Sequence, residues 1–294
     1  MPELTIAAPD GTVLAADEAG EGPPVVLAHG LTATRRYVVM GSRALERAGH
    51  RVMAYDARGH GASAPPPSGD YSYEALAGDL LAVLDDRGLG RAVLAGASMG
   101  AHTLLRLAVD HPERVAGLVV ITPAYVPEAT TDPQRLAEWD RLAAGLREGG
   151  VEGFLAASDF SSMTEEWRET VTRVIRQRLS RHEHPQAVAD ALEAVPRSPP
   201  FPDLQALTGL AQPAVVVGSR DEADPTHPLA TARLYAELLP AARLVVEDEG
   251  SSPLAWQGGR LSRVIAELAA LPEVMVQQAS GRTSRDRPAS SAPS

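Results

Sequence analysis

The stretch Ala92-Val-Leu-Ala-Gly-Ala-Ser-Met-Gly100 decides the fold of this chain. Its first six residues are short and apolar, as a buried strand is, and apolar residues at helical spacing follow over 101–109. Ser98 stands at the sharp turn between them, in the pattern Gly-x-Ser-x-Gly. Such a turn needs minimal side chains two residues before and after the serine, and it pushes the hydroxyl out of the sheet. Ser98 is therefore the candidate nucleophile.

Strands and helices alternate on both sides of this stretch. Apolar, β-branched runs predict strands, and apolar residues three or four apart predict the helices between them. The alternation predicts a mostly parallel sheet with helices on both faces. The expected strands are Pro24–Ala28, Arg51–Tyr55, Ala92–Ala97, Gly117–Thr122, Ala214–Val217 and Arg243–Glu247, and the main helices between or after them are Tyr73–Arg87, Ala101–Val109, Pro228–Leu239 and Leu261–Leu271.

The alternation is interrupted over residues 124–206, where only helical patterns occur. An all-helical insertion in a parallel sheet is expected over the carboxyl ends of the strands, where ligands bind. We therefore expect a core of residues 1–123 and 207–272 with a helical cap of residues 124–206. Residues 273–294 are expected to be a disordered tail, since Ser, Ala, Pro and Arg dominate their end.

Composition excludes several kinds of chemistry. The chain has 294 residues, a formal net charge of -11 and no cysteine, and its 27 basic residues are all arginine. Thiolate nucleophiles, disulfides and lysine Schiff bases are excluded. The acidic balance argues against nucleic acid as a partner. No apolar run reaches the roughly 18 residues of a membrane span, and the N-terminus lacks a signal-peptide pattern, so a cytoplasmic protein acting on a small molecule is expected.

Two further motifs give the chain a family resemblance. His29-Gly30 follows the first predicted strand, and Asp56-Ala-Arg58-Gly-His60-Gly-Ala-Ser63 follows the next. Together with the turn at Ser98, these motifs resemble the α/β-hydrolase superfamily over residues 1–272, with the helical insertion in the place of the family's cap. No cofactor is implied, because Rossmann and P-loop fingerprints are absent. Arg58 and His60 are expected to hold their loop.

The resemblance implies an oxyanion hole of two backbone N–H groups. One belongs to Met99, directly after the nucleophile, and the other belongs to Leu31, in the loop that begins with His29 and Gly30. Donors fixed at such positions stabilise the negative oxygen of a tetrahedral intermediate. The family order of serine, acid and histidine places the acid after the strand 214–217, where the spacing selects Asp221 and leaves Asp224 in reserve.

The histidine of the expected triad is missing. The family pattern Gly-His-Ser-Pro is matched by Gly250-Ser251-Ser252-Pro253, and no histidine follows His227. Ser251 cannot remove a proton from the Ser98 hydroxyl, because a serine hydroxyl is no base near neutral pH.

Three explanations for the missing histidine remain open. Another histidine could supply the base, with His227 the best candidate and His102, His182 and His184 less favoured. The protein could instead catalyse a non-hydrolytic reaction, as a lyase, isomerase or cyclase of the same fold, because a fold does not fix a function. It could also be an impaired binding protein, by natural divergence or by design. The leading expectation is a serine hydrolase acting on a small apolar ester, lactone or thioester, with an incomplete triad.

Overall fold

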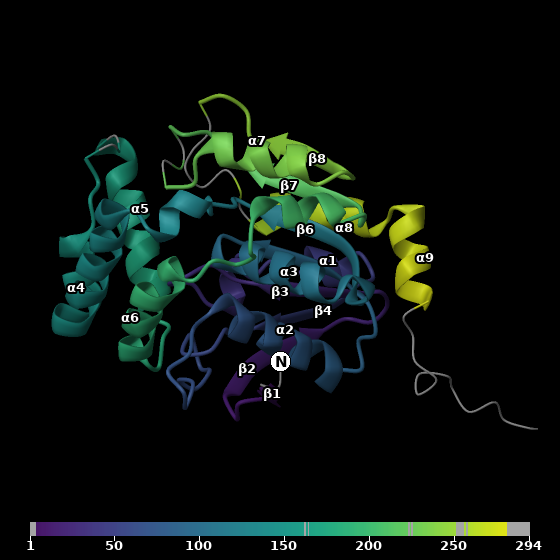
Figure 1. Cartoon of the computed structure of the whole chain (residues 1–294), viewed down its shortest axis with the longest axis horizontal. Coiled ribbons are helices and arrows are strands. Elements are labelled where there is room, and N and C mark those ends of the chain that lie inside the picture. The colour runs from purple at the N-terminus through teal and green to yellow at the C-terminus, as the bar shows by residue number, and fades with distance from the viewer. Residues whose placement is uncertain are drawn as a thin grey trace, which may run out of the picture.

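The computed structural model describes residues 4–161, 163, 165–222, 224, 226–250, 256 and 258–280. Within these residues the core is one eight-stranded sheet in the order β1-β2-β4-β3-β5-β6-β7-β8 (Figure 1). The β1–β2 and β2–β4 pairs are antiparallel, and the other pairs are parallel. The strands are β1 Leu4–Ala7, β2 Val13–Ala19, β3 Pro24–Ala28, β4 Arg51–Tyr55, β5 Ala92–Ala97, β6 Val115–Ile121, β7 Ala214–Gly218 and β8 Ala242–Val246.

The predicted mostly parallel sheet is confirmed, but its first two strands were not predicted. β1 has four residues, and β2 carries Asp17 and Glu18 at its end, so neither gives a clear apolar run. Both lie at the edge of the sheet, where a strand needs less apolar surface because fewer neighbours cover it.

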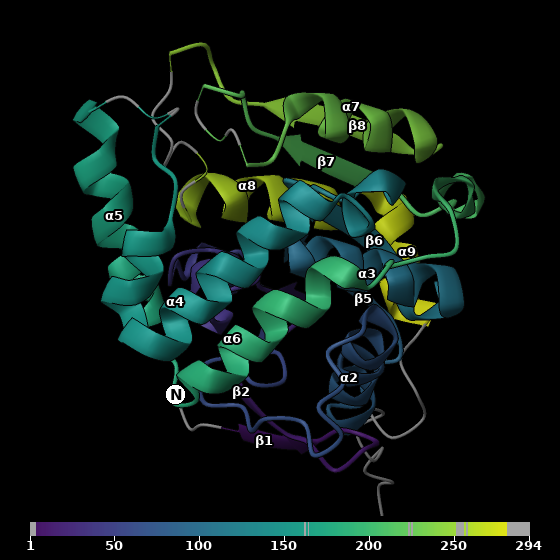
Figure 2. The same cartoon turned by 60° about the vertical axis from the view of Figure 1, so that its left-hand side comes forward.

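Helices cover both faces of the sheet (Figures 1 and 2). α2, α3 and α7 pack on one face, and α1, α8 and α9 pack on the other. α3 begins directly after β5, so its N-terminus lies at the carboxyl edge of the sheet, beside Ser98. The bounds of these helices are α1 Ala44–Arg47, α2 Tyr73–Asp86, α3 Met99–Asp110, α7 Leu229–Leu238, α8 Gly258–Ala269 and α9 Pro272–Ser280. Among the described residues, no helix combines the length and the hydropathy that crossing a membrane requires.

The segment 124–206 contains helices and no strand among its described residues. α4 Pro133–Ala157, α5 Glu165–Leu179 and α6 Pro185–Ala194 lie together at one end of the molecule, at the left in Figure 1 and turned toward the viewer in Figure 2. Short 3-10 turns, η3 Pro127–Thr130, η4 Val195–Arg197 and η5 Leu204–Gly209, connect them to the sheet. Their apolar side chains form a small core of their own, which also packs against Leu31.

The expected tail requires a correction at its start. Residues 272–280 form helix α9 rather than irregular chain. Val274 is buried against the sheet, and the side-chain amide of Gln278 donates a hydrogen bond to the carbonyl of Pro24 at 2.7 Å. Val274 and Gln278 lie one helical turn apart and form the docked face of α9, whereas Met275 and Val276 are exposed. Residues 281–294 lie outside the described part of the chain.

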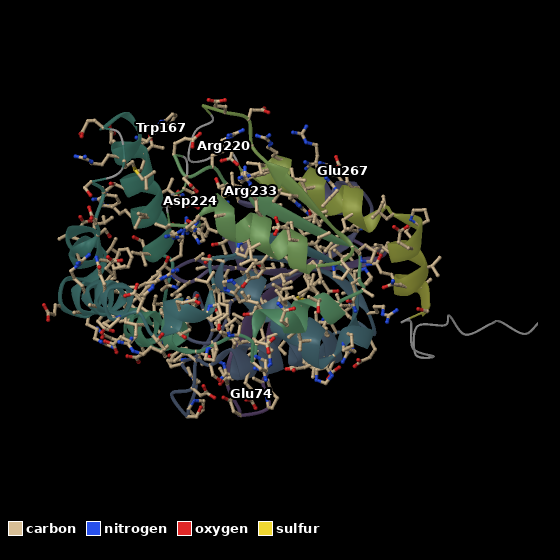
Figure 3. The ribbon with its side chains drawn as sticks, turned by 45° about the horizontal axis from the view of Figure 1, so that its top comes forward. Glu74, Trp167, Arg220, Asp224, Arg233 and Glu267 are labelled. Carbon is tan, nitrogen blue, oxygen red and sulfur yellow. The ribbon has the colours of Figure 1, made fainter. Side chains whose placement is uncertain are left out.

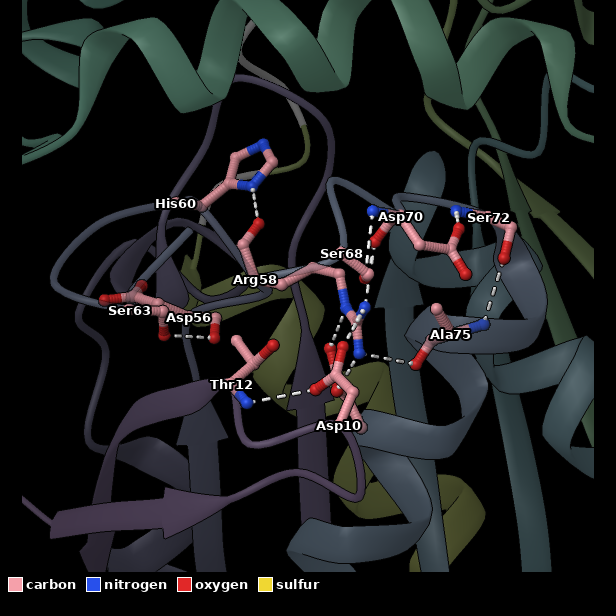
Figure 4. Close-up of polar contacts among 11 residues, drawn as sticks. Asp10, Thr12, Asp56, Arg58, His60, Ser63, Ser68, Asp70, Ser72 and Ala75 are labelled. Atoms are coloured by element: carbon pink, nitrogen blue, oxygen red, sulfur yellow. Dashed lines mark hydrogen bonds and ion pairs between the residues drawn. The ribbon is translucent and has the colours of Figure 1, made fainter. Parts of the chain in front are cut away.

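A buried arginine holds the loop that follows β4 (Figure 4). The guanidinium of Arg58 is 2 % exposed and donates to both carboxylate oxygens of Asp79, at 2.7 and 2.6 Å. It also donates to the Asp10 carboxylate at 3.0 Å and to the backbone carbonyl of Asp70 at 2.8 Å. One side chain therefore joins the β1–β2 turn, the loop after β4 and helix α2.

A histidine fastens the cap to the core. His182 follows α5, and its Nδ1 accepts the backbone N–H of Gly61 at 2.8 Å while its Nε2–H donates to the carbonyl of Thr32 at 3.0 Å. Its ring lies 5.6 Å from that of His60, which in turn lies 5.3 Å from that of His29. Burial lowers the pKa of all three imidazoles, that of His29 to about 3. His182 thus anchors the cap on a row of neutral imidazole rings that meet at tilted and edge-on angles.

We predict that Asp79→Ala destabilises the fold by about 3–5 kcal/mol, because it leaves the buried guanidinium of Arg58 without its carboxylate. Urea unfolding measures the change. The matched control is Asp110→Ala, which removes an exposed pair with Arg106 and should cost no more than about 1 kcal/mol. Equal effects of the two substitutions would contradict the role given to Arg58.

We predict that the free energy of unfolding falls as the pH is lowered from 7.5 to 5.5. Below a pH of about 6.5 the unfolded chain binds protons at its histidines, whereas the folded chain keeps the buried rings neutral. Each such imidazole contributes a slope of up to about 1.4 kcal/mol per pH unit. Replacing His60 by glutamine should flatten the measured dependence, and replacing the exposed His111 should not. A slope that is the same in both variants would refute this assignment.

Candidate functional site

Ser98 sits in the strained turn that its flanking glycines allow. Its backbone has φ 50° and ψ -112°, a conformation that costs energy for any residue with a side chain. A Cβ on Gly100 would lie 2.2 Å from the carbonyl oxygen of Ala28, and one on Gly96 would lie 2.5 Å from the carbonyl of Gly100. Only glycine therefore lets α3 pass so close to β3 and β5. The strain holds the Ser98 hydroxyl at the start of α3, beyond the edge of the sheet.

The imidazole that meets Ser98 is that of His227. The Ser98 Oγ lies 2.9 Å from His227 Nε2, and His227 Nδ1 lies 2.8 Å from Asp224 Oδ2. A carboxylate can only accept, so the ring proton is on Nδ1 and Nε2 is free to accept from the serine hydroxyl. The three side chains therefore form one directed chain of hydrogen bonds from hydroxyl to imidazole to carboxylate.

A single turn of the loop after β7 supplies both the imidazole and the carboxylate. The backbone N–H of His227 donates to the carbonyl of Asp224 at 3.2 Å, which places residues three apart side by side. The Thr226 hydroxyl donates to Asp224 Oδ1 at 2.7 Å and orients the carboxylate from its other side. Figure 3 shows Asp224 on the side of the body that faces the cap. The spacing Asp-x-x-His is the sequence signal for this arrangement.

Asp224 is ionised throughout the pH range of ordinary catalysis. Burial raises the pKa of this carboxyl, but the facing His227 and the hydrogen bonds from Thr226 lower it by more, so that the pKa falls below its ordinary value to about 2. A carboxylate anion in this position is suited to stabilise a protonated His227, which is the task of the acid in a serine, histidine and acid triad.

One sequence expectation about this site changes, and one falls outside the described residues. Asp221, which the family spacing selects as the acid, is exposed, and its Oδ1 accepts the backbone N–H of Leu229 at 2.8 Å, at the start of α7. The contact with the imidazole belongs instead to Asp224, the reserve candidate, because the loop turns back on itself three residues later. Ser251, at the family's histidine position, lies outside the described residues.

The base of this loop is tied to the end of β8 by a buried carboxylate. Glu247 is 1 % exposed and accepts the Ser219 hydroxyl and the backbone N–H of Arg220, each at 2.7 Å. The indole N–H of Trp256 donates to the other oxygen at 3.0 Å. The path of the chain from β7 to Asp224 therefore starts from a fixed point.

Both candidate oxyanion donors lie beside the nucleophile. A Cβ on Gly30 would lie 3.4 Å from the Cβ of Ser98, so the loop that carries Leu31 touches the serine. The Ala33 N–H closes a turn onto the Gly30 carbonyl at 3.0 Å, and Thr32 takes the left-handed φ of 68° that such a turn needs. In the described part of the chain, neither the Leu31 N–H nor the Met99 N–H has a hydrogen-bond partner.

Two other histidines near the site have both ring nitrogens occupied by structural contacts. His29 Nδ1–H donates to the carbonyl of Gly30 at 2.8 Å, and its Nε2 accepts the N–H of Ala57 at 2.9 Å. His102 Nε2 accepts the N–H groups of Ala124 and Tyr125, both at 3.2 Å, at the start of the cap. These imidazoles hold loops in place, and neither faces Ser98.

The sequence analysis missed Thr226 as a part of this region. Thr226 could have been noticed, because it stands between the two residues that it orients. The described residues contain no group of three or more acidic or histidine side chains placed to hold a metal ion.

Several curated proteins that the chain resembles are named as lipases or hydrolases, and one is named as a putative non-heme haloperoxidase. A segment of the chain is 41% identical over 156 residues to an sn-1-specific diacylglycerol lipase of Mus musculus, covering 45% of this chain and 50% of that protein. The chain spans about half or less of the length of the first curated relatives that it matches.

Comparison with solved structures extends over nearly the whole chain. A thermophilic esterase from Thermogutta terrifontis is 26% identical with a TM-score of 0.74, covering 96% of this chain and 100% of that one. An enol-lactonase from Burkholderia xenovorans LB400 is 25% identical with a TM-score of 0.71, covering 90% and 99%.

The model of the alpha/beta hydrolase fold family matches residues 23–257, which include the serine turn, the cap and the loop of His227. These relatives are named as hydrolases, so a hydrolase-like enzyme is what the likeness supports. The chain belongs to the alpha/beta hydrolase fold family.

Proposed function

We propose that this protein is a serine hydrolase of small carboxylic esters, lactones or thioesters, with Ser98, His227 and Asp224 as its catalytic triad. The observation that carries the proposal is the 2.9 Å contact between Ser98 Oγ and His227 Nε2, with Asp224 at 2.8 Å on the far side of the ring. In the proposal, His227 acts as the general base in place of the histidine that the family pattern has at position 251.

The proposed reaction uses only groups already described. The Ser98 oxygen attacks the substrate carbonyl while His227 Nε2 takes the hydroxyl proton. The carbonyl oxygen becomes negative and accepts hydrogen bonds from the N–H groups of Leu31 and Met99, each worth about 3–4 kcal/mol. The tetrahedral intermediate collapses, and His227 returns the proton to the departing alcohol. A water molecule, activated by the same imidazole, then releases the acyl group from Ser98.

The surroundings of the serine support an apolar acyl group next to the reacting carbonyl. Leu31 packs against apolar clusters of both core and cap, and Met99 belongs to the cluster that joins Tyr73 to the cap. The names of the relatives, an esterase, an enol-lactonase and a lipase, support the same bond type. Apolar walls favour substrates that leave water on binding.

The loop that supplies the histidine, and not the order of the triad residues along the chain, sets this proposal apart from the family pattern. The family places the histidine after the last core strand, and here the proposed imidazole comes from the loop after β7, three residues beyond its carboxylate. A triad is recognised by geometry and roles and not by sequence position. The same oxygen, imidazole and carboxylate are therefore able to act from a different loop.

We predict that Ser98→Ala and His227→Gln each reduce kcat/KM for 4-nitrophenyl butyrate by about 10⁴- to 10⁶-fold. Asp224→Asn should cost about 10⁴-fold, because it favours the wrong tautomer of the imidazole. Labelling by a fluorophosphonate probe, followed by mass spectrometry at Ser98, provides the second measurement.

The matched control is Asp221→Asn, which removes a neighbouring carboxylate without touching the imidazole and should leave kcat/KM near that of the parent. The competing hypothesis of an impaired site makes the opposite prediction. In that case the parent is not labelled, and activity appears only in Ser251→His. A strong loss in Asp221→Asn with none in Asp224→Asn would likewise overturn the proposed triad.

A further inference from the structure

The turn that carries the candidate oxyanion donor Leu31 is strained at its next residue, Thr32. The backbone of Thr32 has a φ of 68°, a left-handed conformation that is rare and costly for a β-branched side chain. A residue keeps such a conformation only where contacts from the surrounding structure hold it. Because Leu31 directly precedes Thr32, relaxation of the Thr32 backbone would shift the peptide groups of Leu31 as well.

The two ends of this turn are held from different parts of the molecule. At its first end, the carbonyl of Gly30 accepts the N–H of Ala33 at 3.0 Å and the Nδ1–H of His29 at 2.8 Å, both from the core. At its strained end, the carbonyl of Thr32 accepts the Nε2–H of His182 at 3.0 Å. Among the described residues no second donor reaches that carbonyl. The strained end of the turn is therefore held from the cap.

A single tautomer of His182 makes both of its hydrogen bonds. Its Nδ1 accepts the backbone N–H of Gly61 at 2.8 Å, so the ring proton is on Nε2, where it meets the Thr32 carbonyl. Burial lowers the pKa of this imidazole, which keeps the ring neutral near neutral pH. The side chain is therefore a fixed link between the loop after β4 and the turn of Leu31.

Other contacts keep the cap in place at this point without the imidazole. The backbone N–H of Glu183 donates to the carbonyl of Gly61 at 2.8 Å, and the side chain of Leu31 packs against the apolar cluster of the cap. Neither contact involves the side chain of His182. Replacing the imidazole therefore removes the hydrogen bond to Thr32 while the cap stays docked, which separates the positioning of the turn from the attachment of the cap.

We propose that His182 is a positioning residue for the oxyanion hole: its hydrogen bond to the Thr32 carbonyl holds the strained turn and so keeps the Leu31 N–H directed at the reacting carbonyl oxygen. The inference rests on the proposed function for the role of that N–H. His182 takes no part in the proton transfers. Because a donor displaced by about 1 Å loses much of its effect on the transition state, the reaction depends through this contact on the cap.

Two substitutions separate the two hydrogen bonds of the imidazole. Glutamine places its amide nitrogen near the position of Nε2 and keeps a donor for the Thr32 carbonyl, whereas asparagine places its amide oxygen near Nδ1 and keeps only an acceptor for Gly61. His182→Asn should lower the acylation rate constant with 4-nitrophenyl butyrate by about 10- to 100-fold, and His182→Gln should stay close to the parent. Stopped-flow release of 4-nitrophenolate also gives the dissociation constant of the substrate, which should change little in either variant.

A transition-state analogue provides a readout that a loss of stability alone does not move. When 1,1,1-trifluorohexan-2-one reacts, the Ser98 oxygen adds to its carbonyl, the hydroxyl proton passes to His227, and the carbonyl oxygen becomes the anion that the oxyanion donors bind. The inhibition constant should rise in His182→Asn by the factor by which acylation slows, and it should change little in His182→Gln. The matched control is His184→Asn, in the same connection, whose side chain makes no capping hydrogen bond and whose loss should leave both values unchanged.

Amide hydrogen exchange separates this inference from the proposed reaction. Mass spectrometry of the peptide spanning residues 29–36 should show faster exchange in His182→Asn than in the parent and in His182→Gln. Parent-like exchange in His182→Asn, or parent-like acylation by that variant, overturns the positioning role while the serine hydrolase stands. Equal losses of acylation in both variants, with equal falls in Tm, would assign His182 to the stability of the cap instead. If the parent hydrolyses no ester, the proposed function is overturned, and the exchange alone then decides whether His182 holds the turn.

Discussion

The close approach of helix α3 to strands β3 and β5 is the constraint on which the site depends. A single Cβ at Gly100 would meet the Ala28 carbonyl at 2.2 Å, so the helix starts where it does only because that side chain is absent. The turn then forces Ser98 into a strained conformation and presents its hydroxyl beyond the sheet. The surrounding parallel strands bring the loops of Gly30, Arg58 and His227 to the same edge, since parallel strands end at one side.

The proposed triad shows how a local turn is able to replace a long-range contact. In the family pattern the acid and the histidine come from two different loops, which the sheet must align. Here Asp224 and His227 lie in one turn, three residues apart, and the Asp224 carboxylate is fixed by the Thr226 hydroxyl. The remaining long-range requirement is that this turn face Ser98. Glu247 helps to meet this requirement because its carboxylate accepts hydrogen bonds from Ser219 and Arg220 and so holds the start of the loop against the end of β8.

The cap also helps to hold the loop of the candidate oxyanion donor Leu31 in place. His182, which follows α5, donates to the carbonyl of Thr32 and so helps to hold the turn of Leu31. The neutral imidazoles of His29 and His60 fill the space beneath, where a charged group would need an ion partner. Apolar packing and neutral rings thus meet beside the turn of the candidate oxyanion donor Leu31.

The amino-acid sequence by itself determined the central strands, the turn at Ser98 and the helical character of residues 124–206, because periodicity and glycine placement act locally. It did not reveal the edge strands β1 and β2 or the docking of α9, whose apolar patterns are short. It also pointed to His227 among several histidines, yet favoured Asp221 over Asp224. Only the tertiary structure decided that the loop after β7 folds back toward Ser98 and that Asp224, rather than Asp221, faces the ring. These are contacts between residues up to 129 positions apart, and no local pattern encodes such a distance.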